Sequence, residues 1–97
     1  MNRRVLIVDD EAGIRAALAQ LLEYEGYEVR AVASGKEGVA AYETFRPQLT
    51  FLDVKMAGID GLETLKRLRA ADPAAVVVMI SGHASIQDAV AATNLGA

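Results

Sequence analysis

The chain contains no cysteine, only two prolines, and no apolar run long enough to cross a membrane. Without cysteine there can be no disulfide framework, no thiolate metal site and no thiol nucleophile. The basic start of the chain is followed by an apolar run that is far too short for a signal peptide or a membrane span. These absences fit a protein of the reducing cytoplasm, which is the location we expect.

An excess of basic residues is also lacking. Ten Lys and Arg residues stand against thirteen Asp and Glu, giving a net charge of -3 and a pI near 5.0. Direct binding of nucleic acid needs a basic face, so we expect none from this chain. Ser34-Gly35-Lys36 is not a P-loop, because the upstream glycine is missing and no serine or threonine follows the lysine. A glycine-rich dinucleotide fingerprint is absent as well.

What the chain does contain is alternation of short apolar runs with helical patterns. At 97 residues, 53% of them hydrophobic, it is long enough for one domain with a well-buried sheet. Strands are expected at residues 5–8, 27–32, 49–52 and 75–80. The helices between and after them are expected to bury these residues: Ile14, Ala17, Leu18, Leu21 and Leu22; Val39, Tyr42 and Phe45; Leu62, Leu65 and Leu68; Ile86, Ala89, Val90 and Thr93. This order predicts right-handed βαβ units and a parallel sheet with helices on both faces.

Helix boundaries can be predicted from capping and breaking residues. Ser34 and Glu37 have the spacing of a capping box, and Pro47 ends the helix that they open. Asp60 is the expected cap of the third helix, and Ser85 with Asp88 that of the fourth. The run at 75–80 would be an exposed apolar sheet edge if nothing followed it. We therefore expect an incomplete domain, one strand and one helix short, or a partner chain that covers this edge as a homodimer or segment-exchanged oligomer.

Three carboxylates follow two of the predicted strands. Asp9 and Asp10 come directly after the first strand, and Asp53 follows the third. Open α/β sheets bind ligands at the carboxyl ends of their strands, so neighbouring strands would bring the three acids into one pocket. Crowded carboxylates repel each other, and Mg²⁺ is the divalent cation that such oxygen ligands suit best. A single aspartate after a strand is more often a helix cap, but three together favour a metal site.

The same end of the sheet carries residues suited to phosphoryl chemistry. An aspartate can itself be the nucleophile and form an aspartyl phosphate. Ser81 ends the fourth predicted strand, where its hydroxyl could contact a phosphoryl oxygen or serve only in a turn. Lys55 could screen a phosphoryl group or point to solvent. His83, the one histidine, is expected to be an accessory or surface residue.

These residues, taken together, resemble a known family. The segments Val5–Glu11, Phe51–Met56, Gly58–Gly61 and Met79–His83 are similar, in order and spacing, to the receiver domain of bacterial two-component response regulators. The sequence of Ser81–Ile86, with Ala89 and Val90, is most similar to receivers of enhancer-binding transcriptional activators. The resemblance covers the whole chain, residues 1–97, and implies a flavodoxin-like doubly wound parallel sheet.

The resemblance also implies a function and a set of site residues. Asp53 would accept a phosphoryl group from a sensor histidine kinase, and Ser81 would be the switch hydroxyl. Asp9, Asp10, Asp53 and the backbone carbonyl of Lys55 would hold Mg²⁺, with Lys55, Met56 and His83 as accessory residues. The chain would then be a signalling switch rather than an enzyme, read out through the fourth strand and the helix after it. Its parent protein would carry a DNA-binding output domain.

Departures from the family keep other hypotheses open. Ala57 stands where most receivers have proline, and the sequence stops before the family's fifth strand, its phosphoryl-pairing lysine and its aromatic switch residue. An interaction module that phosphate does not regulate is therefore the alternative. A phosphatase with Asp53 as nucleophile is a third hypothesis, but such enzymes generally need a second acid at the position of Lys55.

Overall fold

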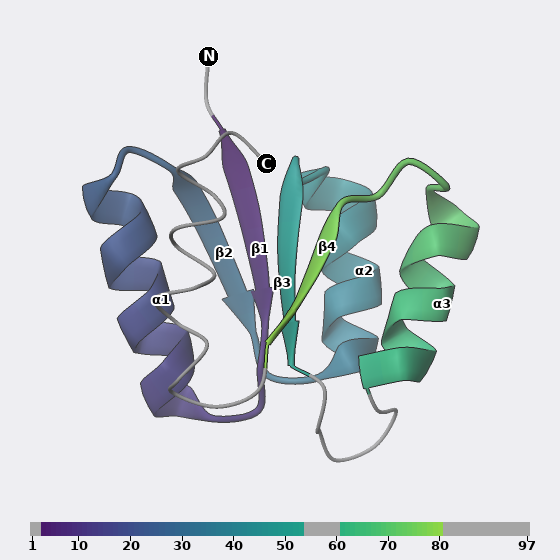
Figure 1. Cartoon of the computed structure of the whole chain (residues 1–97), viewed down its shortest axis with the longest axis horizontal. Coiled ribbons are helices and arrows are strands. Elements are labelled where there is room, and N and C mark those ends of the chain that lie inside the picture. Colours follow the sequence, from purple (N-terminus) through teal and green to yellow (C-terminus); the bar gives the residue numbers. More distant parts are fainter. Residues whose placement is uncertain (1–2, 54–60, 81–97) are drawn as a thin grey trace.

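The computed structural model describes residues 3–53 and 61–80, which form one four-stranded sheet and three helices (Figure 1). In chain order the elements are β1 (Arg4–Val8), α1 (Ala12–Tyr24), β2 (Glu28–Val32), α2 (Gly35–Phe45), β3 (Leu49–Asp53), α3 (Gly61–Ala71) and β4 (Val77–Ile80). All strand pairs are parallel, and the order across the sheet is β2-β1-β3-β4. The predicted doubly wound parallel sheet is confirmed.

The strand order places β1 beside both β2 and β3. Val5 pairs with Val29 on one side and with Leu49 on the other. The chain therefore leaves β1 toward β2, and later returns past β1 to form β3 and β4. The point at which the direction reverses lies between β1 and β3, where open α/β sheets bind their ligands.

Helices cover both faces of the sheet, as Figure 1 shows, with α1 on one side and α2 and α3 on the other. Alternating side chains of β1 point to opposite faces. Val5 and Ile7 pack into a cluster with Ile14, Leu18 and Leu22 of α1. The opposite cluster, against α2 and α3, is formed by Leu6, Val8, Ala41, Tyr42, Phe45, Leu52, Leu68 and Ala75. The near-continuous apolar runs of β1 and β3 therefore fill two cores at once.

The start of α2 largely follows the prediction from its capping box. Ser34 is the N-cap, and its Oγ accepts a hydrogen bond of 3.1 Å from the backbone N–H of Glu37. The Glu37 carboxylate accepts in return from the N–H of Ala33 at 3.3 Å, one residue earlier than a standard capping box would place it. The helix ends at Phe45, before Pro47, with Arg46 in the left-handed conformation at φ 53°.

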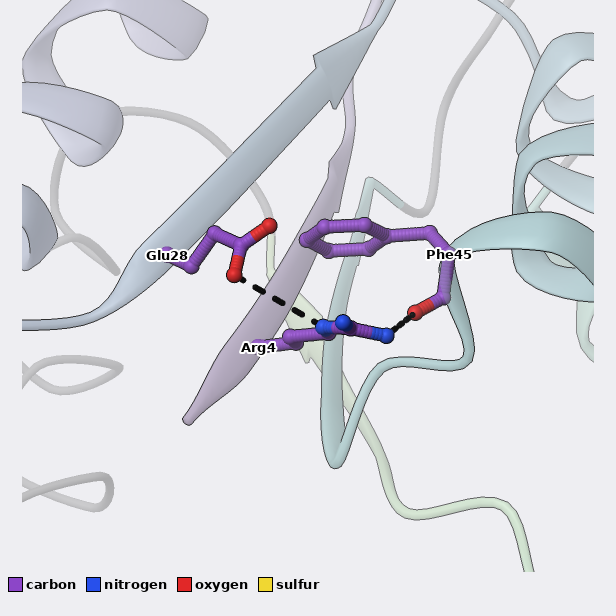
Figure 2. Close-up of polar contacts among 3 residues, drawn as sticks. All are labelled: Arg4, Glu28 and Phe45. Carbon is purple, nitrogen blue, oxygen red and sulfur yellow. Dashed lines mark hydrogen bonds and ion pairs between the residues drawn. The ribbon is translucent and has the colours of Figure 1, made fainter. Parts of the chain in front are cut away.

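The C-terminal end of α2 is held to the sheet by Arg4 (Figure 2). The Arg4 Nη1 donates to the carbonyl oxygen of Phe45 at 3.0 Å, and its Nε lies 3.6 Å from Oε1 of Glu28 on β2. The Arg30 guanidinium lies over the Phe45 ring, 4.8 Å from its centroid. A last-turn carbonyl of α2, which lacks a partner within the helix, is thereby hydrogen-bonded to a cation.

Two residues expected in the core are exposed instead. Leu21 of α1 is 44% exposed and Leu62 of α3 is 60% exposed. The buried stripe of α1 is narrow, with Ile14, Leu18 and Leu22 spaced four residues apart, so Leu21 lies at its margin. On α3 the inward positions are taken by Gly61, Thr64 and Leu68, which turns Leu62 outward. The prediction of burial was wrong for these two leucines.

The strand boundaries differ slightly from the prediction. β4 begins at Val77 rather than residue 75, because the N–H of Ala75 bonds to the carbonyl of Asp72 in a turn. The predicted caps Asp60, Ser85 and Asp88, and the predicted fourth helix, lie outside the described residues. The helices of residues 3–53 and 61–80 include none that could span a membrane.

Candidate functional site

The three predicted acids meet at the carboxyl ends of β1 and β3. Asp9 and Asp10 directly follow β1, and Asp53 is the last residue of β3. Each of the three offers a carboxylate oxygen, and these oxygens all lie within 4.8 Å of one another. The adjacency of β1 and β3 brings together residues more than forty positions apart in the chain. The convergence expected from the sequence is present in the structure.

Asp9 is the most constrained member of the cluster. Its side chain is fully buried, and its backbone N–H donates to the carbonyl of Val32 on β2 at 3.1 Å. Its Oδ1 accepts a hydrogen bond from the N–H of Glu11 at 2.9 Å. Its Oδ2 is buried and has no hydrogen-bond partner within the described part of the chain. Buried polar atoms are nearly always partnered, so this oxygen is an open acceptor for a water or a cation.

The electrostatics of Asp9 point the same way. Burial raises the pKa of its carboxyl above the ordinary 3.8, and the nearby Asp53, Asp10 and Glu11 charges raise it further. The hydrogen bond from the Glu11 N–H opposes this shift without cancelling it. The ionised carboxylate is thus short of positive charge in its surroundings. A hard divalent cation among the three acids would supply it, and the all-oxygen donor set fits Mg²⁺.

The helix-cap explanation does not account for the acids after β1. The N-cap residue of α1 is Glu11, and no capping hydrogen bond to its side chain is found among the described residues. Asp9 holds the N–H of Glu11, which shapes the turn but uses one oxygen only. Asp10 is exposed, while Asp53 is 6% exposed. One exposed and two buried carboxylates facing a common point suit a site that opens to solvent.

Sequence reasoning missed Arg15 as a residue of this region. Its Nη1 donates to the backbone carbonyl oxygen of Asp9 at 2.8 Å, from one turn inside α1. In the sequence Arg15 is only a charged residue beside the apolar Ile14, and no motif includes it. Its role depends on the direction in which α1 leaves the sheet, which residue spacing alone does not specify.

The other predicted site residues cannot be placed. Lys55, Met56, Ser81 and His83 lie outside the described residues, as does Ala57. Their assignments remain predictions from the sequence.

Comparison with known proteins gives a family for the chain. The sequence model of the response regulator receiver domain matches residues 5–97. The chain is 43% identical to the nitrogen assimilation regulatory protein NtrX of Azorhizobium caulinodans, over all of the chain and 22% of that protein. It is 35% identical to the sporulation initiation phosphotransferase F of Bacillus subtilis, over all of the chain and 78% of that protein. The chain thus spans about a fifth of NtrX and most of the shorter relative.

Solved structures are similar in fold. The response regulator TrrA from Thermotoga maritima, in complex with Mg²⁺ and BeF, has a TM-score of 0.79 and is 33% identical, covering 84% of this chain and 70% of that one. TrrA in a complex with the histidine kinase ThkA has a TM-score of 0.77 and is 34% identical, covering 82% of this chain and 69% of that one.

Proposed function

The chain belongs to the family of response regulator receiver domains, and from this premise we propose that it is a phosphorylation-dependent signalling switch with Asp53 as its phosphoacceptor. The single observation that carries the proposal is the convergence of the Asp9, Asp10 and Asp53 carboxylates at the end of β3. Of the three acids, Asp53 is the one that lies within a strand, as the last residue of β3. Its carboxylate is held by β3 and shares its surroundings with two further acids.

The proposed cation is Mg²⁺, held by Asp9, Asp10, Asp53 and the backbone carbonyl of Lys55. When bound, it would neutralise the charge that spreads over the phosphoryl oxygens during transfer. The buried Oδ2 of Asp9 supports this assignment, because the described residues offer it no hydrogen bond. The complex of the related TrrA with Mg²⁺ and BeF supports it independently, since that complex places the same metal in a receiver of the same fold.

The proposed reaction is transfer from a phosphohistidine of a sensor histidine kinase. A carboxylate oxygen of Asp53 attacks the phosphorus, and the new O–P bond forms as the N–P bond to the histidine breaks. The histidine nitrogen leaves with the electron pair of the N–P bond, and because the other ring nitrogen of the phosphohistidine carries a proton, the product is a neutral imidazole. The kinase complex of the related TrrA supports such a partner. The chain supplies the acceptor and its positioning, and in this proposal it is not an enzyme.

The proposed switch uses Ser81 as a hydroxyl that contacts the phosphoryl group. Phosphorylation biases two arrangements of the segment after β4, so the surface offered to an output domain changes. A DNA-binding output domain in the parent protein, a homodimer or segment-exchanged oligomer, and a cytoplasmic location belong to the same proposal. The relationship to NtrX supports the longer parent protein alone, because the match covers 22% of that regulatory protein.

The test is intact-mass spectrometry after incubation with acetyl phosphate and Mg²⁺. Wild type should gain one phosphoryl adduct, whereas Asp53→Asn should gain none. Asp72→Asn is the matched control: it removes a carboxylate between α3 and β4, at the opposite end of the sheet, where Asp72 accepts a hydrogen bond from the Tyr42 hydroxyl. This variant should be labelled like wild type.

Two outcomes would contradict the proposal. An adduct that persists on Asp53→Asn would move the phosphoacceptor elsewhere. Wild type that stays unlabelled while its circular dichroism spectrum is that of a folded protein would favour the alternative, an interaction module that phosphate does not regulate.

A further inference from the structure

The peptide that joins Asp9 to Asp10 is held by an unusual donor. Its carbonyl oxygen accepts the 2.8 Å hydrogen bond from the half-buried Arg15 guanidinium. The backbone N–H of Arg15 also donates, at 3.1 Å, to the carbonyl of Glu11. Arg15 of α1 thus donates to two carbonyls of the acidic segment Asp9–Glu11, one on either side of Asp10.

With this contact, all but one of the polar atoms of Asp9 have a hydrogen-bond partner. Its N–H is bonded to Val32, its carbonyl oxygen to Arg15 and its Oδ1 to the Glu11 N–H. Only Oδ2 is buried with no partner in the described ranges. Because the Asp9–Asp10 peptide plane sets the directions in which the two neighbouring side chains leave the backbone, holding its carbonyl orients both carboxylates.

The choice of acceptor is informative. A guanidinium beside several acids would ordinarily pair with a carboxylate, where it would compete with a cation. Here its short bond goes to the backbone carbonyl. The contact therefore orders the acids while leaving the buried Oδ2 of Asp9 available.

We propose that Arg15 is a positioning residue of the acidic site. By holding the Asp9 carbonyl, it orients the Asp9 and Asp10 carboxylates to bind a divalent cation. The proposal rests on the proposed function for its cation, and it adds a residue that touches neither cation nor phosphoryl group. Removing a residue that hydrogen-bonds to a metal ligand, without touching the metal, typically weakens metal binding by about 10–100-fold.

An effect of charge alone would change the Mg²⁺ affinity in the opposite direction. Arg15 is a cation near a cation site, so removing its charge would strengthen Mg²⁺ binding if electrostatic repulsion were its only effect. Positioning predicts that the same removal weakens binding. A purely structural link between α1 and β1 predicts a loss of stability with no change in the affinity of the folded protein.

The experiment is an Mg²⁺ titration followed by two-dimensional ¹H–¹⁵N NMR, which reports the dissociation constant and the folded state in the same spectra. The variants are Arg15→Gln, which removes the charge, and Arg15→Lys, which keeps the charge but loses the planar fork. Arg67→Gln is the matched control, because Arg67 lies on α3 and contacts Glu63 at 3.2 Å instead of the acidic segment. Urea denaturation of each variant measures stability separately.

We expect Arg15→Gln to raise the Mg²⁺ dissociation constant about tenfold. Arg15→Lys should raise it by less, and Arg67→Gln should leave it unchanged. An Arg15→Gln protein that binds Mg²⁺ as tightly as wild type, or more tightly, overturns the proposal. If Arg15→Gln does not give the spectrum of a folded protein, an unchanged constant for Arg15→Lys overturns it.

The outcomes also separate this proposal from the proposed function. Weaker Mg²⁺ binding in Arg15→Gln, together with a wild type that takes no phosphoryl group, would support positioning and contradict phosphoacceptance. A wild type that is phosphorylated, together with unchanged Mg²⁺ binding in Arg15→Gln, would support phosphoacceptance and contradict positioning. A wild type that binds no Mg²⁺ would overturn the positioning proposal and the proposed cation site together.

Discussion

Gly38 of α2 lies so close to β1 that a single methyl group should disturb the sheet beside the acidic site. A Cβ built at Gly38 would lie 2.8 Å from Cγ2 and 3.2 Å from Cγ1 of Val8. Val8 is fully buried and precedes Asp9 directly. Its branched side chain has little freedom to rotate away. We therefore expect Gly38→Ala to destabilise the protein although alanine is the better helix former.

Two opposing contributions determine how much Gly38→Ala changes the free energy of unfolding. Replacing glycine by alanine inside a helix gains about 0.5–1 kcal/mol. Forcing a methyl group into a close-packed interface costs typically about 1–3 kcal/mol. The expected net loss is about 1 kcal/mol, which for a domain of this size lowers the melting temperature by roughly 4–8 °C.

Urea denaturation followed by circular dichroism measures this loss. The matched control is Gly13→Ala on α1, where a Cβ would meet nothing within 4 Å, so the same change should stabilise the protein there. In a Val8→Ala background the space is free, and Gly38→Ala should then stabilise by about 0.5–1 kcal/mol. A Gly38→Ala protein that is more stable than wild type, or a double variant with no coupling, would refute the close approach of α2 to β1.

Three further changes test other parts of the structure. Ser34→Ala removes the α2 cap and should cost about 1 kcal/mol in urea denaturation; an unchanged midpoint would argue against the Ser34–Glu37 bond. Thr50→Val should raise the melting temperature, by a gain of about 1 kcal/mol, because the buried Thr50 hydroxyl has no partner within residues 3–53 and 61–80; a lower value would show that the hydroxyl is satisfied. The contribution of Asp9 to stability is full below pH 3.8, its ordinary pKa, and is lost as the pH rises through the raised pKa of the folded state. With divalent cations removed, Asp9→Asn should therefore gain stability over wild type as the pH rises from acid to neutral, and parallel pH curves for the two proteins would contradict the shift.

The sheet and its acids were predictable because their signals are local and strong. The apolar runs at Val5–Val8 and Leu49–Leu52 have no competing helical period, and acids end both. Parallel pairing of two such strands then brings Asp9, Asp10 and Asp53 together without any knowledge of side-chain conformations. The α2 cap was predictable for the same reason, since Ser34 and Glu37 are three residues apart.

What sequence could not supply were the contacts that depend on how closely elements approach. Hydrophobic periodicity marked Leu21 and Leu62 as core residues, but the width of a buried stripe depends on the neighbouring elements. Gly38 of α2 carries no hydrophobic signal, although it allows the helix to approach β1 closely. The Arg15 contact depends on the direction of α1 relative to β1, which has no counterpart in residue spacing.

The position of β1 in the middle of the sheet has a consequence for how the chain folds. β1 is synthesised before its partners; it pairs with β2 and, across two helices, with β3, where Val5 meets Leu49. Every strand pairing closes a long loop, so the entropy of the chain opposes each step before contacts repay it. The acidic site can form only after β3 docks on β1. Asp9 and Asp10 therefore come together with Asp53 only once the chain as far as β3 has been synthesised and folded.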